Sequence, residues 1–420
     1  MVDIAQDHSE QDHVRDQDPG VAAVGSPPRV AGPSRRGFLA VAGGAMVTVA
    51  VGGAVAGDVY AVRRGVFASG SGAAYAPWGA WDQGAVPLRL VQAGILAANA
   101  HNAQAWRFAV SPRRIEVYDD TRRGLGTVDP YRREIHLSTG CAIENIALAA
   151  SAAGYHPTVT LAPTGHPTLL ATVDLAPGGS TNSLLYQAIP HRHTDRGAYQ
   201  SGRNLPADIP AGMDALADQP DVRVQWLLTT AQRAAFSALT IAATQAFIAD
   251  LRQSGDDYAW YRGTWQQVQA HRDGVTVDAS GLSPLMRALG KLVPADRATN
   301  GTYWLSGTRD RQLPTASGFA VLLVRDATDL TQRLNAGRLY QRLHLWATTR
   351  GLAMQPLNQS VERAERERST TGPGPIGAAL TALIDDPAWQ PVMPFRLGYP
   401  TGPAPASPRR AIGDVLVTTP

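Results

Sequence analysis

The sequence contains a single cysteine, Cys141, and a single lysine, Lys291, among its 420 residues. One cysteine cannot form an internal disulfide, so a fold outside the cytoplasm would have to be stable without one. Arginine supplies nearly all of the positive charge, and the formal net charge is only +3. No basic block is interleaved with aromatic residues, so the sequence gives no electrostatic case for nucleic-acid binding. Since 44% of the residues are hydrophobic and 17% are charged, a globular protein with a large core is expected.

Several common catalytic motifs are also missing. The sequence has no P-loop, no HExxH and no GxSxG. Residues 372–377 fit the GxGxxG spacing, but their two prolines argue against the helix that should follow. His191 and His193 lack a third ligand at a suitable spacing, so no metal is predicted. Cys141 opens an apolar stretch and is interpreted as a small buried hydrophobe rather than a nucleophile.

The first 57 residues are expected to form a tail and an export signal. Residues 1–33 are polar and acidic, which predicts a disordered tail. Residues 34–57 contain Arg35-Arg36, then Phe-Leu, then a weakly apolar run that closes with Ala-Val-Ala. This order resembles a twin-arginine signal, which implies export of the folded protein through the twin-arginine translocon to the cell envelope or the medium. The alternative is an uncleaved membrane anchor, because about 20 apolar residues can span a bilayer.

The rest of the chain is predicted to comprise a linker and two halves. Residues 58–84 are interpreted as a linker that docks through Trp78 and Trp81. The first half, residues 85–180, has helical patterns at 88–98 and 142–153 and short strand patterns at 106–110, 115–118, 159–161 and 169–173. The second half, residues 181–415, has helical patterns at 231–252 and 336–350 and strand patterns at 319–324 and 394–398. Residues 255–300 read as an irregular, aromatic insertion, interpreted either as a lid or as ordinary packing.

A faint internal repeat suggests that the halves are related. Residues 138–155 align with residues 335–352 at a constant offset, so that Gly140 meets Gly337 and Gly154 meets Gly351. Each copy reads as glycine, apolar helix, glycine and strand. Although chance could give a few such identities, their positions at both helix ends favour a duplicated α+β unit.

Three polar stretches carry the candidate site residues. Residues 99–108 place the amides of Asn102 and Gln104 before a strand, where they could bond the edge of a planar ring or simply cap the strand. Residues 191–196 place Arg192, His193, Thr194 and Arg196 within about one turn, which suits a phosphate but is also typical of a solvated loop. The third stretch is Arg409-Arg410, which reads as a second phosphate clamp or as a basic tail.

Together these stretches resemble motifs of the nitroreductase superfamily of FMN-dependent flavoproteins. Residues 192–196 (Arg-His-Thr-Asp-Arg) are similar to its arginine motif, and residues 102–108 (Asn-Ala-Gln-Ala-Trp-Arg-Phe) to its Asn-x-Gln-Pro-Trp-x-Phe motif. Residues 351–358 resemble its late Gly-Leu segment, and residues 397–410 its closing strand and basic pair. In ordinary members the arginine motif comes first, in a short chain that dimerises. The reversed order here resembles the Acg-like branch, in which two units are fused.

The resemblance implies an α+β nitroreductase-like fold in which two fused units form a pseudo-dimer, and the chain is expected to be a monomer. It implies one FMN, whose phosphate would be held by Arg192 with Arg409 or Arg410. His193, Thr194 and Arg196 would lie along the ribityl chain and pyrimidine. Asn102 and Gln104 would lie at the ring edge, and Pro356 and Leu357 near N5. Two departures from the family pattern are Ala105 in place of proline and Asp195 within the phosphate motif.

The implied activity is that of an exported FMN oxidoreductase. Hydride would pass from a reduced donor such as NAD(P)H to the flavin, and electrons from there to a nitroaromatic or quinone, with no catalytic side chain required. The alternative is an FMN storage or sequestration protein without turnover. No membrane partner is expected unless the signal is retained.

Overall fold

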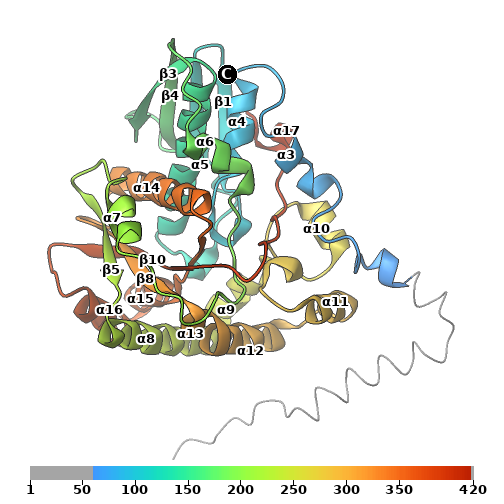
Figure 1. The fold of residues 1–420 in the computed structure, drawn as a ribbon, viewed down its shortest axis with the longest axis vertical. Helices are drawn as coiled ribbons and strands as arrows, with labels where there is room; N and C mark the ends of the chain where they lie inside the picture. Colours follow the sequence, from blue (N-terminus) through green and yellow to red (C-terminus); the bar gives the residue numbers. More distant parts are fainter. Residues whose placement is uncertain (1–59, 418–420) are drawn as a thin grey trace, which may run out of the picture. The chain divides into compact units, whose positions relative to one another are not determined.

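Two antiparallel four-stranded sheets dominate residues 60–417, which are the residues described by the computed structural model (Figure 1). The first sheet has the order β1 (Trp106–Ser111), β2 (Arg114–Asp119), β4 (Leu169–Pro177), β3 (Tyr155–Leu161). The second has the order β5 (Val222–Leu227), β8 (Gly318–Val324), β10 (Gln390–Gly398), β9 (Ala353–Pro356). The predicted α+β class is confirmed. The predicted tail and twin-arginine segment lie outside the described residues.

The two sheets share one topology. If the strands of each sheet are numbered 1 to 4 in chain order, their spatial order is 1-2-4-3 in both sheets. All neighbouring strands are antiparallel. A 20-residue helix connects the second and third strands in each case: α5 (Arg133–Ala152) in the first half and α14 (Leu330–Thr349) in the second. This matched topology supports the predicted duplication, which stays a prediction.

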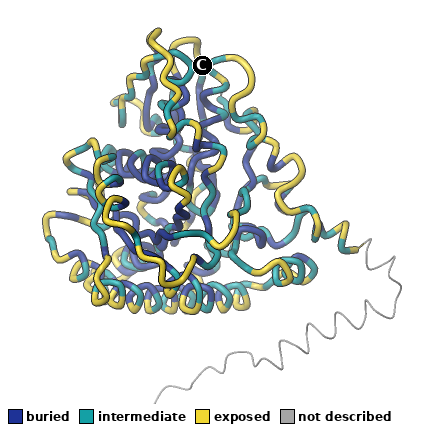
Figure 2. Tube along the Cα trace, in the orientation of Figure 1, coloured by how far each residue is buried: buried dark blue, intermediate teal, exposed yellow. Residues whose placement is uncertain are grey.

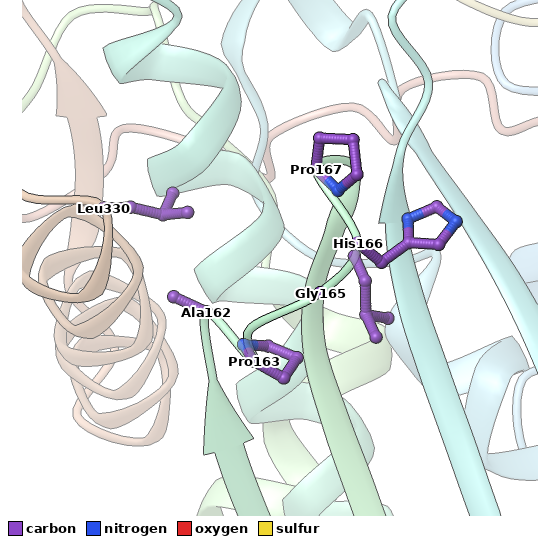
Figure 3. A pocket seen from close by; sticks show the side chains of 7 residues that line it. Ala162, Pro163, Gly165, His166, Pro167 and Leu330 are labelled. Atoms are coloured by element: carbon purple, nitrogen blue, oxygen red, sulfur yellow. The ribbon is translucent and has the colours of Figure 1, made fainter.

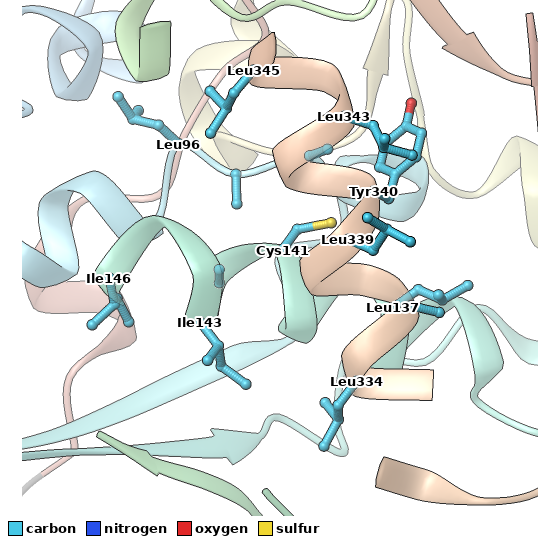
Figure 4. Packing of buried hydrophobic residues seen from close by; sticks show 14 of the residues in the cluster. Leu96, Leu137, Cys141, Ile143, Ile146, Leu334, Leu339, Tyr340, Leu343 and Leu345 are labelled. Atoms are coloured by element: carbon cyan, nitrogen blue, oxygen red, sulfur yellow. The ribbon is translucent and has the colours of Figure 1, made fainter. Parts of the chain in front are cut away.

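Helices α5 and α14 pack against each other between the two sheets (Figures 2 and 4). Their closest approach is reciprocal: a Cβ atom on Gly140 would collide with the carbonyl oxygen of Leu334, and a Cβ atom on Gly337 with that of Leu137. Cys141 lies at the same crossing, where its thiol donates to the carbonyl of Gly337 at 3.1 Å. Burial raises the pKa of Cys141 to about 12, which agrees with its interpretation as an unreactive core residue.

The second sheet is buried on both faces. Every residue of β8 is buried; Ala320, Leu322 and Val324 belong to the main core beside α14. Phe319, Val321 and Leu323 face a second core on the other side of the sheet. That side is covered by α8 (Thr230–Ala249), α15 (Gln359–Thr370) and α16 (Pro375–Ile384).

Three helix boundaries differ from the sequence predictions. Helix α5 begins at Arg133 rather than near Ala142, because its polar first turns are buried by tertiary contacts that an apolar pattern does not reveal. Helix α8 ends at Ala249, since Asp250 is extended and caps α9 (Leu251–Tyr258) instead of continuing the helix. The expectation that prolines prevent a helix after residue 374 is wrong, because Pro375 occupies the first turn of α16, where no N–H is needed.

The insertion is ordered rather than irregular. It contains β6 (Tyr261–Arg262), α10 (Trp265–His271), β7 (Val275–Thr276) and α11 (Pro284–Leu292), and α12 (Arg297–Gly307) follows. The remaining helices are α3 (Ala76–Gly79), α4 (Leu88–Gly94), α6 (Leu184–Ala188), α7 (Asp208–Asp214), α13 (Leu313–Thr315) and α17 (Ile412–Val415). Within the described residues no single helix is long and apolar enough to cross a membrane; the pair α8 and α9, bent by 91°, meets that test only jointly.

Candidate cofactor site

A strained polar turn connects α4 to β1. It includes the 3-10 turn Ala100–Asn102, and His101, Asn102 and Gln104 all have positive φ, between 50° and 51°. The amide oxygen of Asn99 fixes the turn by accepting from the N–H of Gln104 at 2.9 Å. Left-handed conformations at residues other than glycine cost free energy and concentrate at functional sites. This turn is therefore a candidate functional site.

Residues from both halves of the chain meet beside this turn. Arg192 donates from Nη2 to the carbonyl oxygen of Leu96 at 3.1 Å, and Arg409 donates from its own Nη2 to the same oxygen at 3.3 Å. Arg409 also donates to Oδ1 of Asn102 at 2.7 Å. Nη1 of Arg192 lies 3.3 Å from Nδ1 of His344 on α14. We call Arg192, Arg409, Asn102 and His344 the arginine cluster.

The arginine cluster is cationic and buried. Arg192 is 2% exposed and Arg409 is 1% exposed, and within the described residues neither forms an ion pair with a carboxylate. The Nε atoms of both arginines are buried and find no hydrogen-bond partner in the part of the chain that the structure describes. Burial lowers the pKa of Arg192, and burial together with the charge of Arg192 lowers the pKa of Arg409 well below its usual value. An anion at this place would offset a desolvation cost that the protein alone leaves uncompensated.

Trp78 closes one side of the arginine cluster. Its ring lies 4.9 Å from Cζ of Arg409, and its centroid lies 4.5 Å from that of His193 in an edge-on contact. The indole N–H donates to the carbonyl of Ser407 at 2.7 Å. Burial and the two arginines lower the pKa of His193 to about 3, so its imidazole is neutral near pH 7.

The insertion closes another side. The N–H of Gly274 donates to the carbonyl of Asn102 at 3.3 Å, and Nε2 of Gln104 donates to the carbonyl of Arg272 at 2.9 Å. Arg196 donates to the carbonyl of Ala279 at 3.3 Å. Residues 272–281 therefore contact both the amide motif and the arginine motif.

The other predicted site residues lie apart from the arginine cluster. Arg410 makes hydrogen bonds to Gln104 and not within the arginine cluster. Its backbone N–H donates to Oε1 of Gln104 at 2.8 Å, and its Nη1 donates to the backbone carbonyl of Gln104 at 3.1 Å. The half-buried side chain of Thr194 makes no hydrogen bond among the described residues. Pro356 ends β9, and Leu357 packs in the core under α8 and α16.

Sequence reasoning missed two groups on α14. Tyr340 and His344 occupy one face of this helix at a spacing of one turn, and the hydroxyl of Tyr340 is buried without a partner. Polar residues at helical spacing on an otherwise apolar helix could have indicated them. The carbonyl of Leu96, to which both arginines donate, leaves no signal in the sequence.

An apolar surface hollow lies elsewhere, between the β3–β4 turn and the start of α14 (Figure 3). It is lined by Ala162, Pro163, Gly165, His166, Pro167, Leu169 and Leu330. None of the ten predicted site residues contributes to it.

Known proteins are similar to this chain in sequence and, more weakly, in structure. No family model matches the chain. Two Mycobacterium tuberculosis proteins, from strains CDC 1551 and H37Rv and named provisionally as NAD(P)H nitroreductases, are each 26% identical over 337 residues, covering 77% of this chain and 88% of theirs.

Solved structures give weaker matches. The FMN-dependent nitroreductase NfnB of Mycobacterium smegmatis, in complex with NADPH, is 14% identical with a TM-score of 0.36, and covers 56% of this chain and 98% of its own. An FMN-bound nitroreductase of Bacteroides fragilis is 13% identical with a TM-score of 0.33, covering 57% and 100%. The sequence similarity to the two mycobacterial proteins extends over most of both chains.

Proposed function

We propose that this protein is an FMN-dependent oxidoreductase of the nitroreductase type that uses NAD(P)H as electron donor. The observation that carries the proposal is the arginine cluster: two buried guanidinium groups, without carboxylate partners in the described part of the chain, meet an amide from the first half. The names of the sequence relatives supply the electron donor and the reaction class, and the motif resemblance supplies the cofactor, FMN.

The residues present fit the phosphate of FMN. Arg192 and Arg409 would hold the phosphate. Each has a buried Nε–H without a partner among the described residues, and both guanidinium groups converge on the carbonyl oxygen of Leu96. Bound FMN would supply the hydride acceptor and donor, which no side chain can provide.

The polar turn would orient the flavin ring. Asn102 now accepts from Arg409 and donates from Nδ2 to the carbonyl of Pro408 at 2.9 Å, so its amide would exchange these partners for the ring edge. Arg196 would place a positive charge near the pyrimidine, where it stabilises negative charge on the reduced ring. Residues 272–281 and Trp78 would exclude water from the site.

The fusion of two units, as in the Acg-like branch, is part of the proposal. In a dimeric nitroreductase the cofactor lies between subunits, and here Asn102 and Arg192 come from the two predicted halves. The matched strand orders and the reciprocal glycine contacts of α5 and α14 support it, because a two-fold-related interface makes each contact twice. We further propose flat acceptors, nitroaromatics or quinones, and export by the twin-arginine route.

The test is direct. The purified full chain is saturated with FMN, freed of excess cofactor, and mixed with NADPH without air. Bleaching of the yellow colour, followed by its return on addition of a nitroaromatic or a quinone, is the expected result. A protein that stays yellow would be a flavin store rather than a reductase, and a chain that never retains FMN would contradict the proposal entirely.

A further inference from the structure

A second cluster of polar side chains lies on the other side of the polar turn. One ring nitrogen of His101 and one carboxylate oxygen each from Glu134 and Glu362 lie within 4.8 Å of one another. They come from three separate elements: the 3-10 turn at residues 100–102, the first turn of α5, and the first turn of α15. Glu134 is 2% exposed and Glu362 is 5% exposed, so this is an interior site rather than a surface group of acids.

The imidazole of His101 is oriented for a ligand. Its Nε2 lies 2.8 Å from Oδ1 of Asp257 on α9, while its Nδ1 is buried and has no hydrogen-bond partner among residues 60–417. A carboxylate that holds one ring nitrogen fixes the orientation of the ring and leaves the lone pair of the other nitrogen available, as in many carboxylate–histidine–metal sites.

The charge in this region is not balanced by the protein. Glu134 pairs with Arg133 at 3.2 Å, but Glu362 forms no ion pair within the described residues. Oδ1 of Asp129, a residue 4% exposed, is also buried without a partner. Buried carboxylates of this kind need either a proton or a cation.

We propose that His101, Glu134 and Glu362 bind a divalent transition-metal ion. One imidazole nitrogen and two carboxylate oxygens are a ligand set for Zn²⁺, Mn²⁺ or Fe²⁺, whereas Ca²⁺ and Mg²⁺ prefer sites made of oxygen alone. Asp257 supports His101 from behind. The site does not depend on the proposed flavin, although the polar turn carries residues of both, His101 for the metal and Asn102 for the cofactor.

Metal binding is measured directly on the full chain. The protein is dialysed against EDTA and then titrated with Zn²⁺ or Mn²⁺ by calorimetry, with Mg²⁺ as the contrast, and the bound metal is counted by mass spectrometry. We expect about one Zn²⁺ or Mn²⁺ per chain and much weaker binding of Mg²⁺. The absence of stoichiometric binding would overturn the proposal and would indicate that Glu134 and Glu362 share a proton instead.

Variants assign the ligands. Glu362→Gln removes a ligand without breaking an ion pair and should abolish stoichiometric binding, while Asp257→Asn should weaken it by about 10- to 100-fold. Glu116→Gln, on β2 and outside the cluster, is the matched control and should bind as the unaltered chain does. Thermal unfolding of each metal-free variant shows that it is folded. Unchanged affinity in Glu362→Gln would also overturn the proposal.

Discussion

Arg192 and Arg409 donate to the same carbonyl oxygen, that of Leu96, although they lie at opposite ends of the second half of the chain. Two like charges are brought together in the interior, and among residues 60–417 neither forms an ion pair with a carboxylate. Such an arrangement is costly for the free protein and favourable for one that receives an anion. It is therefore the feature of this molecule most easily tested by substitution.

The adjacent arginines 409 and 410 make a matched pair for that test. Arg409→Gln should weaken FMN binding by roughly 10- to 100-fold, because it removes a charge-assisted hydrogen bond of about 1.5–3 kcal/mol. Arg410→Gln should have a much smaller effect, since Arg410 binds Gln104 and lies outside the arginine cluster. Quenching of flavin fluorescence during titration measures both. Equal losses in the two variants would indicate that the phosphate lies elsewhere.

The close crossing of α5 and α14 predicts that a methyl group added at either glycine of the crossing destabilises the fold. Gly140→Ala and Gly337→Ala should each lower the free energy of unfolding by about 1–3 kcal/mol or more, because each new methyl group would meet a backbone carbonyl that cannot easily move. Chemical denaturation followed by circular dichroism gives the values.

The control for those variants is Gly255→Ala. Gly255 lies within α9 with open space around it, so alanine there should raise stability by about 0.5–1 kcal/mol through helix propensity. An equal gain in stability for Gly140→Ala would contradict the close contact between α5 and α14 at this glycine.

Buried histidines predict acid sensitivity. Burial and Arg192 lower the pKa of His193 to about 3 and that of His344 well below its usual value, while the unfolded chain titrates near 6.5. Below about pH 6.5 the unfolded state binds protons that the folded state does not. Stability should therefore fall as the pH falls from about 6.5 toward 3, with each such histidine contributing up to about 1.4 kcal/mol per pH unit.

His344→Gln tests the contribution of one of these histidines. Nδ1 of His344 lies 3.3 Å from Nη1 of Arg192. The amide oxygen of glutamine should accept from the same guanidinium group but does not titrate. The variant should lose less stability than the unaltered chain between pH 7 and pH 5, measured by urea denaturation at each pH. An identical pH dependence would show that His344 takes up protons equally in the folded and unfolded states, and so would contradict the prediction.

The twin-arginine prediction is tested in cells. Changing both Arg35 and Arg36 to Lys should retain the full-length protein in the cytoplasm of a bacterium that has the twin-arginine translocon, as followed by cell fractionation. The same change at Arg63 and Arg64 is the control, because this pair follows the apolar run instead of preceding it. Export of the first variant at normal efficiency would rule the signal out.

Much of the framework could be read from the sequence because its signals are local. Strands β1 and β2, the apolar faces of α5 and α14, and the glycines that end both helices follow from periodicity and from glycine placement. Predictions failed where tertiary contacts decided. The first turn of α5 is polar and buried, Asp250 caps α9 instead of continuing α8, and the insertion orders into α10 and α11.

The candidate site shows the same division. The sequence pointed to Asn102, Arg192 and the pair Arg409-Arg410, because amide and guanidinium groups at these spacings suit a flavin phosphate and ring. The sequence could not show which of Arg409 and Arg410 joins the arginine cluster, because this depends on the direction in which each side chain extends. Nor could it find His344 or the meeting of His101 with Glu134 and Glu362, which come from distant segments.

Residue type and spacing alone determined which chemical groups this protein has available, and where its helices and strands tend to form. Which of those groups meet was decided only by the packing of α5 on α14 and by the placement of residues 272–281, since contact between distant segments depends on how whole elements bury their apolar faces.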